Sequence, residues 1–244
     1  MNTVSRRDSA FLAEMGVGPL WTLRHQPPAD ALVPVDQQPS TPAEPDIAQM
    51  DWPALRAAIT SCDRCGACRP GARPVHGAGA EAAVWLVAAG ATSVADEAAN
   101  LPVAGEAGTL LDNMLAAAGH ARARDVYVTN LVKCRPVSAN GGDRAPTADE
   151  VAACRPFVER ELALTGATVM LTLGQVAANA MLGKPLQEAL AGARGQVHAV
   201  AGAALVATLH PGELLRRGLD KALAWADLCR AVTASAPEGD ERAA

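Results

Sequence analysis

The stretch YVTNLVKCRP, residues 127–136, decides the fold that the chain is expected to adopt. Its first residues, preceded by Val126, are aromatic or β-branched, which favours a strand over residues 125–130. The strand ends at Asn130, whose amide both donates and accepts hydrogen bonds in one plane. Ligands of open α/β sheets bind beyond the carboxyl ends of the strands. Asn130 is therefore either a side chain that reads a ligand or an ordinary turn-forming residue.

Length and composition restrict the class of protein. The chain has 244 residues, 50% of them hydrophobic, with a formal net charge of −5. This is enough for one substantial domain with extensions. No apolar run reaches the roughly 18 residues that a membrane span needs, and the N-terminus lacks the apolar segment of a signal peptide. We therefore expect a cytoplasmic protein without membrane contact, whose acidic balance leaves room only for a local basic cleft.

Strand and helix patterns alternate over residues 51–235. The expected helices lie at residues 52–60, 109–118, 148–164, 175–182 and 219–233. Buried strands are expected at residues 83–89, 125–130 and 168–173, followed by a hairpin or adjacent strands at 196–200 and 204–208. A strand–helix–strand order implies parallel pairing. The pattern predicts a three-layer α/β/α sandwich.

The ends of the chain carry weaker signals. Residues 1–25 are predicted to form an N-terminal helical extension, and residues 26–50 a Pro-rich flexible linker. Residues 236–244 are expected to be a disordered tail.

Two pairs of cysteines suggest a metal site. Cys62 and Cys65 have the CxxC spacing of metal ligands, and Cys134 and Cys154 lie in a loop and the helix after it. In a reducing compartment, thiols are more often metal ligands than disulfide partners. Four thiolates suit either zinc or an iron–sulfur cluster, and ligand softness does not choose between them.

The remaining cysteines are less informative. Cys68 follows Cys65 at an equally good spacing, so its role is ambiguous. Cys154 has the alternative of being a small buried hydrophobe. Cys229 stands alone on an apolar helix, and for it we expect that structural role.

A series of motifs then appears in one order along the chain. They are Cys62-x-x-Cys65 with Gly77-x-Gly79, Asn130-x-x-Lys133-Cys134-Arg135-Pro136, Pro146-Thr147-x-x-Glu150 with Cys154, Leu173-Gly174, Arg194-Gly195, and His210-Pro211 with Leu214-Leu215-Arg216. Over residues 62–231, these motifs resemble the family-four uracil-DNA glycosylases, which are DNA-repair enzymes with a 4Fe-4S cluster. The resemblance implies a central parallel four-stranded sheet, with the pocket at the carboxyl ends of its strands.

The resemblance also implies roles for individual residues. The cluster ligands would be Cys62, Cys65, Cys134 and Cys154, with Cys68 an additional thiol and the cluster structural. Asn130 would read the pairing edge of uracil, donating to O4 and accepting from N3–H, whereas cytosine presents the reverse pattern. His210 would face the carbonyl oxygen on which negative charge builds, and a neutral imidazole donor stabilises such a leaving anion. The other implied residues are Gly90, Ala91 and Val103 for base binding and Lys133, Arg216 and Arg217 for DNA phosphates.

Departures from the family pattern fall in the same region. Gly90 stands where the family has an acidic residue that helps place the attacking water, and the nearest carboxylates are Asp96 and Glu97. Val103 stands where the family has the Phe that stacks on the flipped base. Base stacking contributes about 1–3 kcal/mol, and a general base about 10²–10⁴-fold in rate. Glu213, after His210-Pro211, adds a negative charge where a phosphate is expected.

These observations predict an enzyme with an unusual site. We expect a monomeric DNA N-glycosylase, a hydrolase that cleaves the N-glycosidic bond of deoxyuridine in single- or double-stranded DNA with reduced or altered activity. The alternative is a catalytically degenerate module that keeps the fold and the cluster and binds DNA or a partner. A metal-stabilised α/β domain without a nucleic-acid role is the third reading.

Overall fold

The computed structural model describes residues 7, 10, 11, 14–16, 46–69 and 71–235. Two compact units divide the chain at Met1–Glu44 and Pro45–Ala244, and the second contains the sheet. Apart from a few positions, the predicted helical extension lies outside the described residues, as do the tail at 236–244 and the linker up to residue 45.

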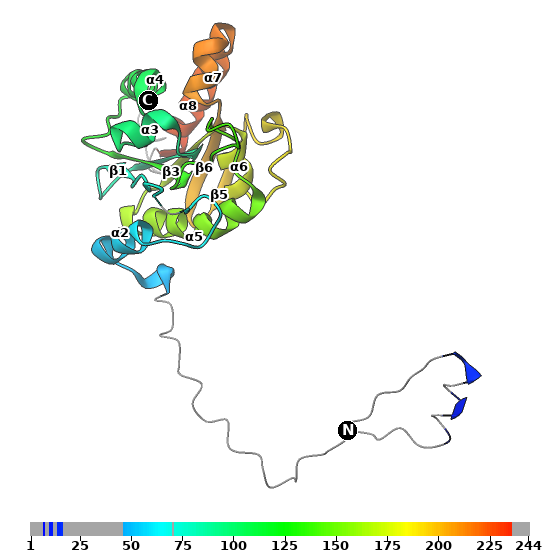
Figure 1. The fold of residues 1–244 in the computed structure, drawn as a ribbon. Helices are drawn as coiled ribbons and strands as arrows, with labels where there is room; N and C mark the ends of the chain where they lie inside the picture. The colour runs from blue at the N-terminus through cyan, green and yellow to red at the C-terminus, as the bar shows by residue number, and fades with distance from the viewer. Residues whose placement is uncertain (1–6, 8–9, 12–13, 17–45, 70, 236–244) are drawn as a thin grey trace. The chain divides into compact units, whose positions relative to one another are not determined.

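A six-stranded sheet forms the middle layer of the domain, in the order β1-β3-β2-β4-β6-β5 (Figure 1). Its strands are β1 (Ala78–Gly79), β2 (Trp85–Ala91), β3 (Val126–Val132), β4 (Val169–Leu173), β5 (Val197–Val200) and β6 (Ala203–Thr208). The four central strands pair in parallel, while β1 and β5 pair antiparallel at the two edges. The predicted fold class is confirmed, and the two short edge strands extend its four-stranded centre.

Helices cover both faces of this sheet. They are α2 (Trp52–Thr60), α3 (Val94–Ala99), α4 (Gly105–Ala117), α5 (Ala148–Thr165), α6 (Gln175–Met181), α7 (Pro211–Arg216) and α8 (Lys221–Ser235), with the 3₁₀ turns η2 (Ile47–Gln49), η3 (Leu190–Gly192) and η4 (Gly218–Asp220). Alternate strand residues face opposite sides, so two apolar clusters form. Leu86 and Met170 pack with residues of α2 and α5 on one face. Trp85 and Val87 pack with residues of α4 and α8 on the other.

Local sequence explains where the longest helix begins and ends. The Thr147 hydroxyl accepts a hydrogen bond from Glu150 N–H, and the Glu150 carboxylate accepts one from Thr147 N–H. This is the capping box that the sequence predicted. Gly166 closes the helix in the left-handed conformation that glycine adopts without strain.

Some sequence-based predictions of element bounds, of helices and of burial are wrong. Residues 46–50 were expected in the flexible linker, but Ile47 and Met50 are buried in the core beside α5. The short helices α3 and α7 were not predicted, because six residues are too few to show a helical period. Cys229 was expected to be buried, but it lies on an exposed part of α8. No helix within the described ranges is long and apolar enough to cross a bilayer.

Candidate active site and cysteine cluster

The predicted base-reading residues lie at the carboxyl-end edge of the parallel strands. Asn130 is near the end of β3, opposite Ala89 of β2, and Gly90 and Ala91 end β2. His210 follows β6 and is the N-cap residue of α7. The strand order therefore gathers these residues from distant parts of the sequence at one edge of the sheet.

Asn130 is fully buried, and its amide orientation is fixed by two acceptors. Asn130 Nδ2 donates to Asp96 Oδ2 at 3.0 Å and to Thr92 Oγ1 at 3.2 Å. Asn130 Oδ1 is buried and has no hydrogen-bond partner among the described residues. Both amide hydrogens are thus already used within the protein. No hydrogen of Asn130 is left for the expected hydrogen bond to uracil O4 in this arrangement. Asn130 Oδ1, which is buried and unpartnered within the described ranges, is the atom that is left to accept from N3–H.

Asp96 lies in the site, although the sequence indicated it only as a nearby carboxylate. It belongs to α3, and its side chain completes a capping box with Ser93. Asp96 Oδ1 accepts from Ala104 N–H at 2.7 Å, and Oδ2 accepts from Ser93 N–H at 3.1 Å. The pattern Ser93-x-x-Asp96 is a capping-box signal that could have revealed this helix. Because Asp96 is buried and holds three N–H groups, it is poorly placed to take a proton from water.

His210 is held in one tautomer by its own helix. Gly212 N–H donates to His210 Nδ1 at 3.1 Å, so in the neutral ring the hydrogen is on Nε2. Burial lowers the pKa of His210 below its usual value, and Arg216 acts in the same direction. The carboxylates of Glu213 and Asp96 oppose this shift. The result is a neutral imidazole whose Nε2–H can donate to a ligand.

Val103 occupies a strained and tightly held position. Its φ of 51° lies in the left-handed region, which β-branched residues rarely adopt and which costs on the order of 1–3 kcal/mol. The Arg122 guanidinium donates to Val103 O at 3.0 Å and to Pro102 O at 2.8 Å. A Cβ at Gly108 would stand 2.3 Å from Val103 O, so only glycine lets α4 approach this closely. The Val103 side chain itself is buried in the apolar cluster.

Gly90 leaves little room for the acidic residue that the family pattern has there. A Cβ at Gly90 would lie 3.1 Å from the Val176 Cβ of α6. Any side chain at this position therefore requires α6 to move by a few tenths of an ångström. Glu97, the other nearby carboxylate, lies 3.7 Å from Arg135 in an ion pair.

The prediction that Lys133 contacts DNA phosphate is wrong. Lys133 is only 2% exposed. Its Nζ donates to Glu161 Oε2 of α5 at 2.7 Å and to Thr129 Oγ1 at 2.6 Å. A buried ammonium with two protein partners is not available to a surface ligand. The prediction was based on the Lys-Cys-Arg-Pro motif, and a motif of this kind does not show in which direction a side chain points.

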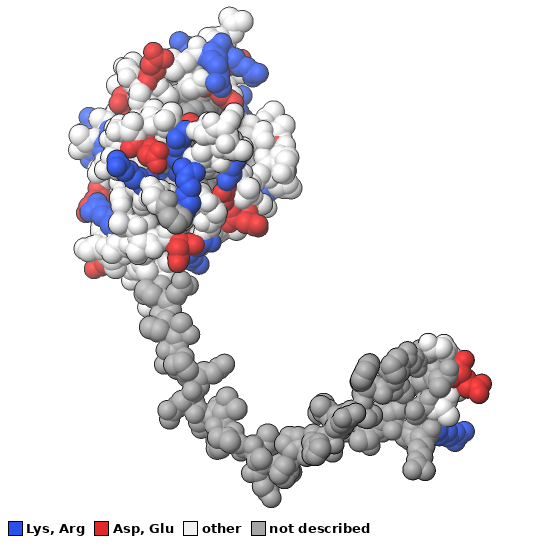
Figure 2. Space-filling view, in the orientation of Figure 1, with Lys and Arg blue, Asp and Glu red and all other residues white. Residues whose placement is uncertain are grey.

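Arg216 and Arg217 are both exposed where α7 ends. Figure 2 shows basic side chains gathered at the end of the domain where Figure 1 places α7. Elsewhere on this face, basic and acidic side chains are interspersed. The position of these two arginines is compatible with phosphate contact, which stays a prediction.

The predicted metal ligands gather on the α5 side of the sheet. Cys134 and Cys154 are buried, while Cys62 and Cys65 are half-buried, and all four belong to the same apolar cluster. Cys68 lies among them, with its sulfur 3.5 Å from those of Cys65 and Cys134 and 3.8 Å from that of Cys62. The structure thus brings a fifth thiol into the group and leaves the ligand set a prediction.

The donor chemistry of this group fits an iron–sulfur cluster. All its donors are sulfur, which suits iron–sulfur clusters and zinc. Burial raises the pKa of Cys134, and that of Cys154 to about 12, so a cationic centre is needed to make them thiolates. No set of three or more His, Cys, Asp or Glu side chains in the described ranges is arranged around a single-ion site.

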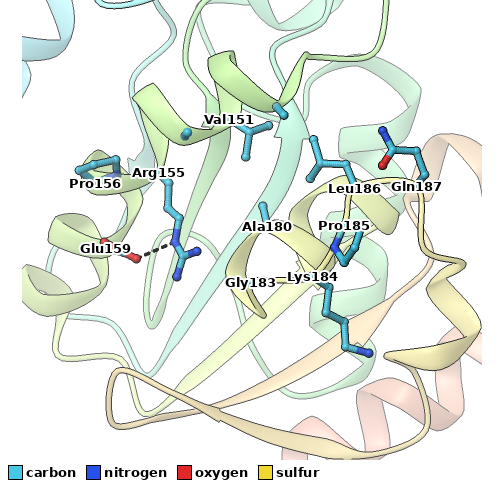
Figure 3. A pocket seen from close by; sticks show the side chains of 12 residues that line it. Val151, Arg155, Pro156, Glu159, Ala180, Gly183, Lys184, Pro185, Leu186 and Gln187 are labelled. Carbon is cyan, nitrogen blue, oxygen red and sulfur yellow. Dashed lines mark hydrogen bonds and ion pairs between the residues drawn. The ribbon is translucent and has the colours of Figure 1, made fainter. Parts of the chain in front are cut away.

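A separate pocket lies away from these residues. It has a volume of about 450 Å³ and is formed by α5 and the segment around Lys184 and Pro185 (Figure 3). The cations at its edge are already paired, Arg155 with Glu159 at 2.7 Å and Lys184 with Glu188 at 2.8 Å. None of the predicted base-reading residues lines it.

Comparison with known proteins identifies the family. The model of the uracil DNA glycosylase superfamily matches residues 76–229. The chain belongs to the uracil DNA glycosylase superfamily. Among curated relatives, the type-4 uracil-DNA glycosylase of Pyrobaculum aerophilum is 30% identical over 182 residues, covering 69% of this chain and 86% of the relative. The predicted family-four membership is confirmed.

Two further type-4 uracil-DNA glycosylases align over shorter ranges. That of Archaeoglobus fulgidus is 36% identical over 120 residues, which is 49% of this chain and 58% of the relative. That of Thermotoga maritima is 35% identical over 117 residues, which is 47% of this chain and 57% of the relative. The superfamily match contains Asn130 and His210 and begins after Cys62 and Cys65.

Proposed function

We propose that this protein is a DNA N-glycosylase that removes uracil by hydrolysing the N-glycosidic bond of deoxyuridine. The observation that carries the proposal is the bond from Gly212 N–H to His210 Nδ1. It leaves the Nε2–H of a neutral imidazole as a donor at the edge of the sheet where Asn130 Oδ1 is a free acceptor. Type-4 uracil-DNA glycosylases among the relatives support the same activity.

The two residues would act on different parts of the base. Asn130 Oδ1 accepts the N3–H of uracil and fixes the orientation of the ring. His210 Nε2–H donates to the carbonyl oxygen that gains negative charge as the glycosidic bond breaks. Removing one such donor typically costs about 10²–10³ in kcat. A flipped nucleotide also costs a few kcal/mol to extrude, least in single strands or mismatches.

Water activation is the weak part of this site. Gly90 has no carboxylate, and Asp96 is fully engaged by Ser93, Ala104 and Asn130. Val103 replaces an aromatic plate with a small buried side chain. We therefore expect slow, uracil-selective excision, fastest on single-stranded DNA.

We further propose a 4Fe-4S cluster held by Cys62, Cys65, Cys134 and Cys154. Bound there, the cluster supplies a structural cross-link between the segment after α2, the end of β3 and α5. The Lys133 backbone N–H, which hydrogen-bonds Cys154, orients one of the donors. Arg216 and Arg217 would contact DNA phosphates beside the edge of the sheet that carries Asn130 and His210. A monomeric state, a cytoplasmic location and a helical N-terminal extension joined by a flexible linker remain part of the proposal.

One observation favours a second function. The positions that differ from the family, Gly90 and Val103, are those that would carry the water-placing acid and the stacking ring. A protein that keeps the fold, the cluster and Asn130 without them would serve as a DNA-binding module.

A single assay separates the two functions. Purified protein is incubated with a single-stranded oligonucleotide that contains one uracil, and the abasic product is measured after alkaline cleavage. If the protein is an enzyme, abasic product should form with native protein and be lost in His210→Ala. The control variant Cys229→Ser, on the exposed face of α8, should still form it. Binding of the oligonucleotide without any product supports the binding module instead.

A further inference from the structure

Three polar side chains form a closed network beside the base-reading edge of the sheet. They are Thr92, which follows β2, Asp96 of α3 and Asn130 of β3, and each is 4% exposed or less. Thr92 Oγ1 donates its hydrogen to a backbone carbonyl, at 2.8 Å from Lys133 O. It therefore has only lone pairs to offer to Asn130 Nδ2.

The network determines which way the Asn130 amide faces. A carboxylate can only accept, so the group 3.0 Å from Asp96 Oδ2 must be the amide nitrogen and not the amide oxygen. Rotating the amide by half a turn would place two oxygens against each other in a buried site. Asn130 is thus locked with its nitrogen towards Asp96 and Thr92 and its oxygen as the remaining hydrogen-bonding atom.

We propose that Asp96 is a positioning residue that makes Asn130 a pure hydrogen-bond acceptor, so that the site takes only bases with a ring N–H at the pairing edge. Uracil and thymine meet this condition through N3–H, and the purines hypoxanthine and guanine meet it through N1–H, so this acceptor does not by itself separate uracil from thymine. Cytosine and adenine present a bare nitrogen lone pair at the same place and are rejected. This substrate class rests on the proposed function, since it describes the base that the same site excises.

The expected discrimination is large. A buried site built to hydrogen-bond one group rejects an analogue without it by about 10⁴–10⁵-fold. The polar partners of Asn130 contribute because they prevent the amide from adapting to the wrong base. Without Asp96, rotation of the amide would present N–H groups to cytosine N3.

The test is the isosteric variant Asp96→Asn. Its amide can keep an oxygen towards Ala104 N–H while offering hydrogens to Asn130, which then rotates. The hydrogen bond from Ser93 N–H is lost in this variant, because an amide nitrogen in the place of Oδ2 cannot accept it. We expect the ratio of uracil to cytosine excision, as kcat/KM on single-stranded DNA, to fall by at least about tenfold, the worth of one hydrogen bond. Glu97→Gln, the neighbouring carboxylate paired with Arg135, is the matched control and should leave the ratio unchanged.

A readout without turnover keeps the inference separate from the proposed function. The Asn130 side-chain amide signal in ¹⁵N NMR, assigned by its loss in Asn130→Asp, should exchange slowly with solvent in the native protein. The chemical shift of this signal should change in Asp96→Asn and stay the same in Glu97→Gln. Thr92→Val removes the other acceptor and should also shift the signal, which covers the case in which Asp96→Asn does not fold.

The outcomes are distinct. If native protein excises no uracil but the amide signal responds to Asp96→Asn, the proposed function fails and the positioning role stands. If folded Asp96→Asn leaves both the Asn130 signal and the base ratio unchanged, the inference is overturned. The same holds if native protein removes cytosine as fast as uracil.

Discussion

Asn130 and Lys133 stand three residues apart near the end of β3 and are both buried, but they differ in how completely the protein satisfies their hydrogen-bonding groups. Lys133 turns to the α5 side, where Glu161 and Thr129 accept its hydrogen bonds. Asn130 turns to the α3 side, where Asp96 and Thr92 take its hydrogens and its oxygen stays without a protein partner.

The difference teaches how to separate structure from function in buried polar groups. A satisfied pair such as Lys133–Glu161 has no capacity left for a ligand. A buried acceptor without a partner costs stability, and at the carboxyl-end edge of the parallel strands, where Asn130 lies, it favours a role in binding. By this criterion the Lys133–Glu161 pair has a structural role, and the network of Asn130, Asp96 and Thr92 is the one that we propose reads the base. The predictions below either break or sharpen this distinction.

The largest expected effect concerns the cysteines on the α5 side. Serine at Cys134 or Cys154 should bleach the visible absorption of anaerobically purified protein and strongly lower its melting temperature, because a structural metal group contributes folding energy. Cys229→Ser, on the exposed face of α8, should change neither. Cys68→Ser should keep the visible absorption. If this variant loses the absorption, Cys68 belongs to the ligand set. Colourless protein with stoichiometric zinc would rule out the iron–sulfur cluster.

The second largest effect is expected for Lys133→Met. It leaves the Glu161 carboxylate buried without its partner, which costs about 3–5 kcal/mol of unfolding free energy in denaturant titrations. Lys184→Met, which breaks the more exposed pair with Glu188, should cost less than about 1 kcal/mol. Adding Glu161→Leu to Lys133→Met should restore most of the loss. A small effect of Lys133→Met alone would contradict the structural role.

On the other side of the comparison, His210→Ala should affect activity more than stability. Loss of its donor should lower kcat by about 10²–10³. Loss of the N-cap bond to Gly212 should cost only about 1 kcal/mol of unfolding free energy. Single-turnover excision and urea unfolding of the same samples measure both. If His210→Ala lowers the unfolding free energy as much as Lys133→Met does, the distinction between a structural Lys133 and a functional His210 is contradicted.

Stability should also depend on pH through His210. Burial holds its folded pKa below the ordinary value of 6.5, so the unfolded chain binds the proton first. The stability that depends on neutral His210 is complete above about pH 6.5 and is lost as the pH falls towards the folded pKa. Arg216 strengthens this dependence, while Glu213 and Asp96 weaken it. His210→Ala should flatten the curve of unfolding free energy against pH in that range.

The smallest effect is expected at the surface. Arg216→Ala should reduce the slope of log binding constant against log salt for single-stranded DNA by roughly 1, as for one lost phosphate contact. Lys133→Met should leave this slope unchanged, since Lys133 does not reach the surface. Fluorescence anisotropy at several salt concentrations measures both slopes. If both variants reduce the salt slope by the same amount, Lys133 does contact DNA phosphate, as the sequence predicted.

Much of the fold could be predicted because its signals are local. The apolar run around Val87 and the capping box at Thr147 depend on neighbours a few residues away, and both elements lie close to their predicted positions. The helices α3 and α7 escaped because they are short. Residues 46–50 escaped because Ile47 gains its burial from α5, far along the chain.

For this protein the sequence by itself determined the family, the parallel sheet and the identity of Asn130 and His210 as the residues to examine. These follow from the order and spacing of motifs and from local periodicity, which the chain carries wherever it folds. Only the tertiary structure decided that Lys133 points inward, that Cys68 joins the other thiols and that Asp96 fixes the Asn130 amide. The physical reason is that hydrogen bonds and burial depend on distances between segments, as between Asp96 and Asn130, which no local pattern contains.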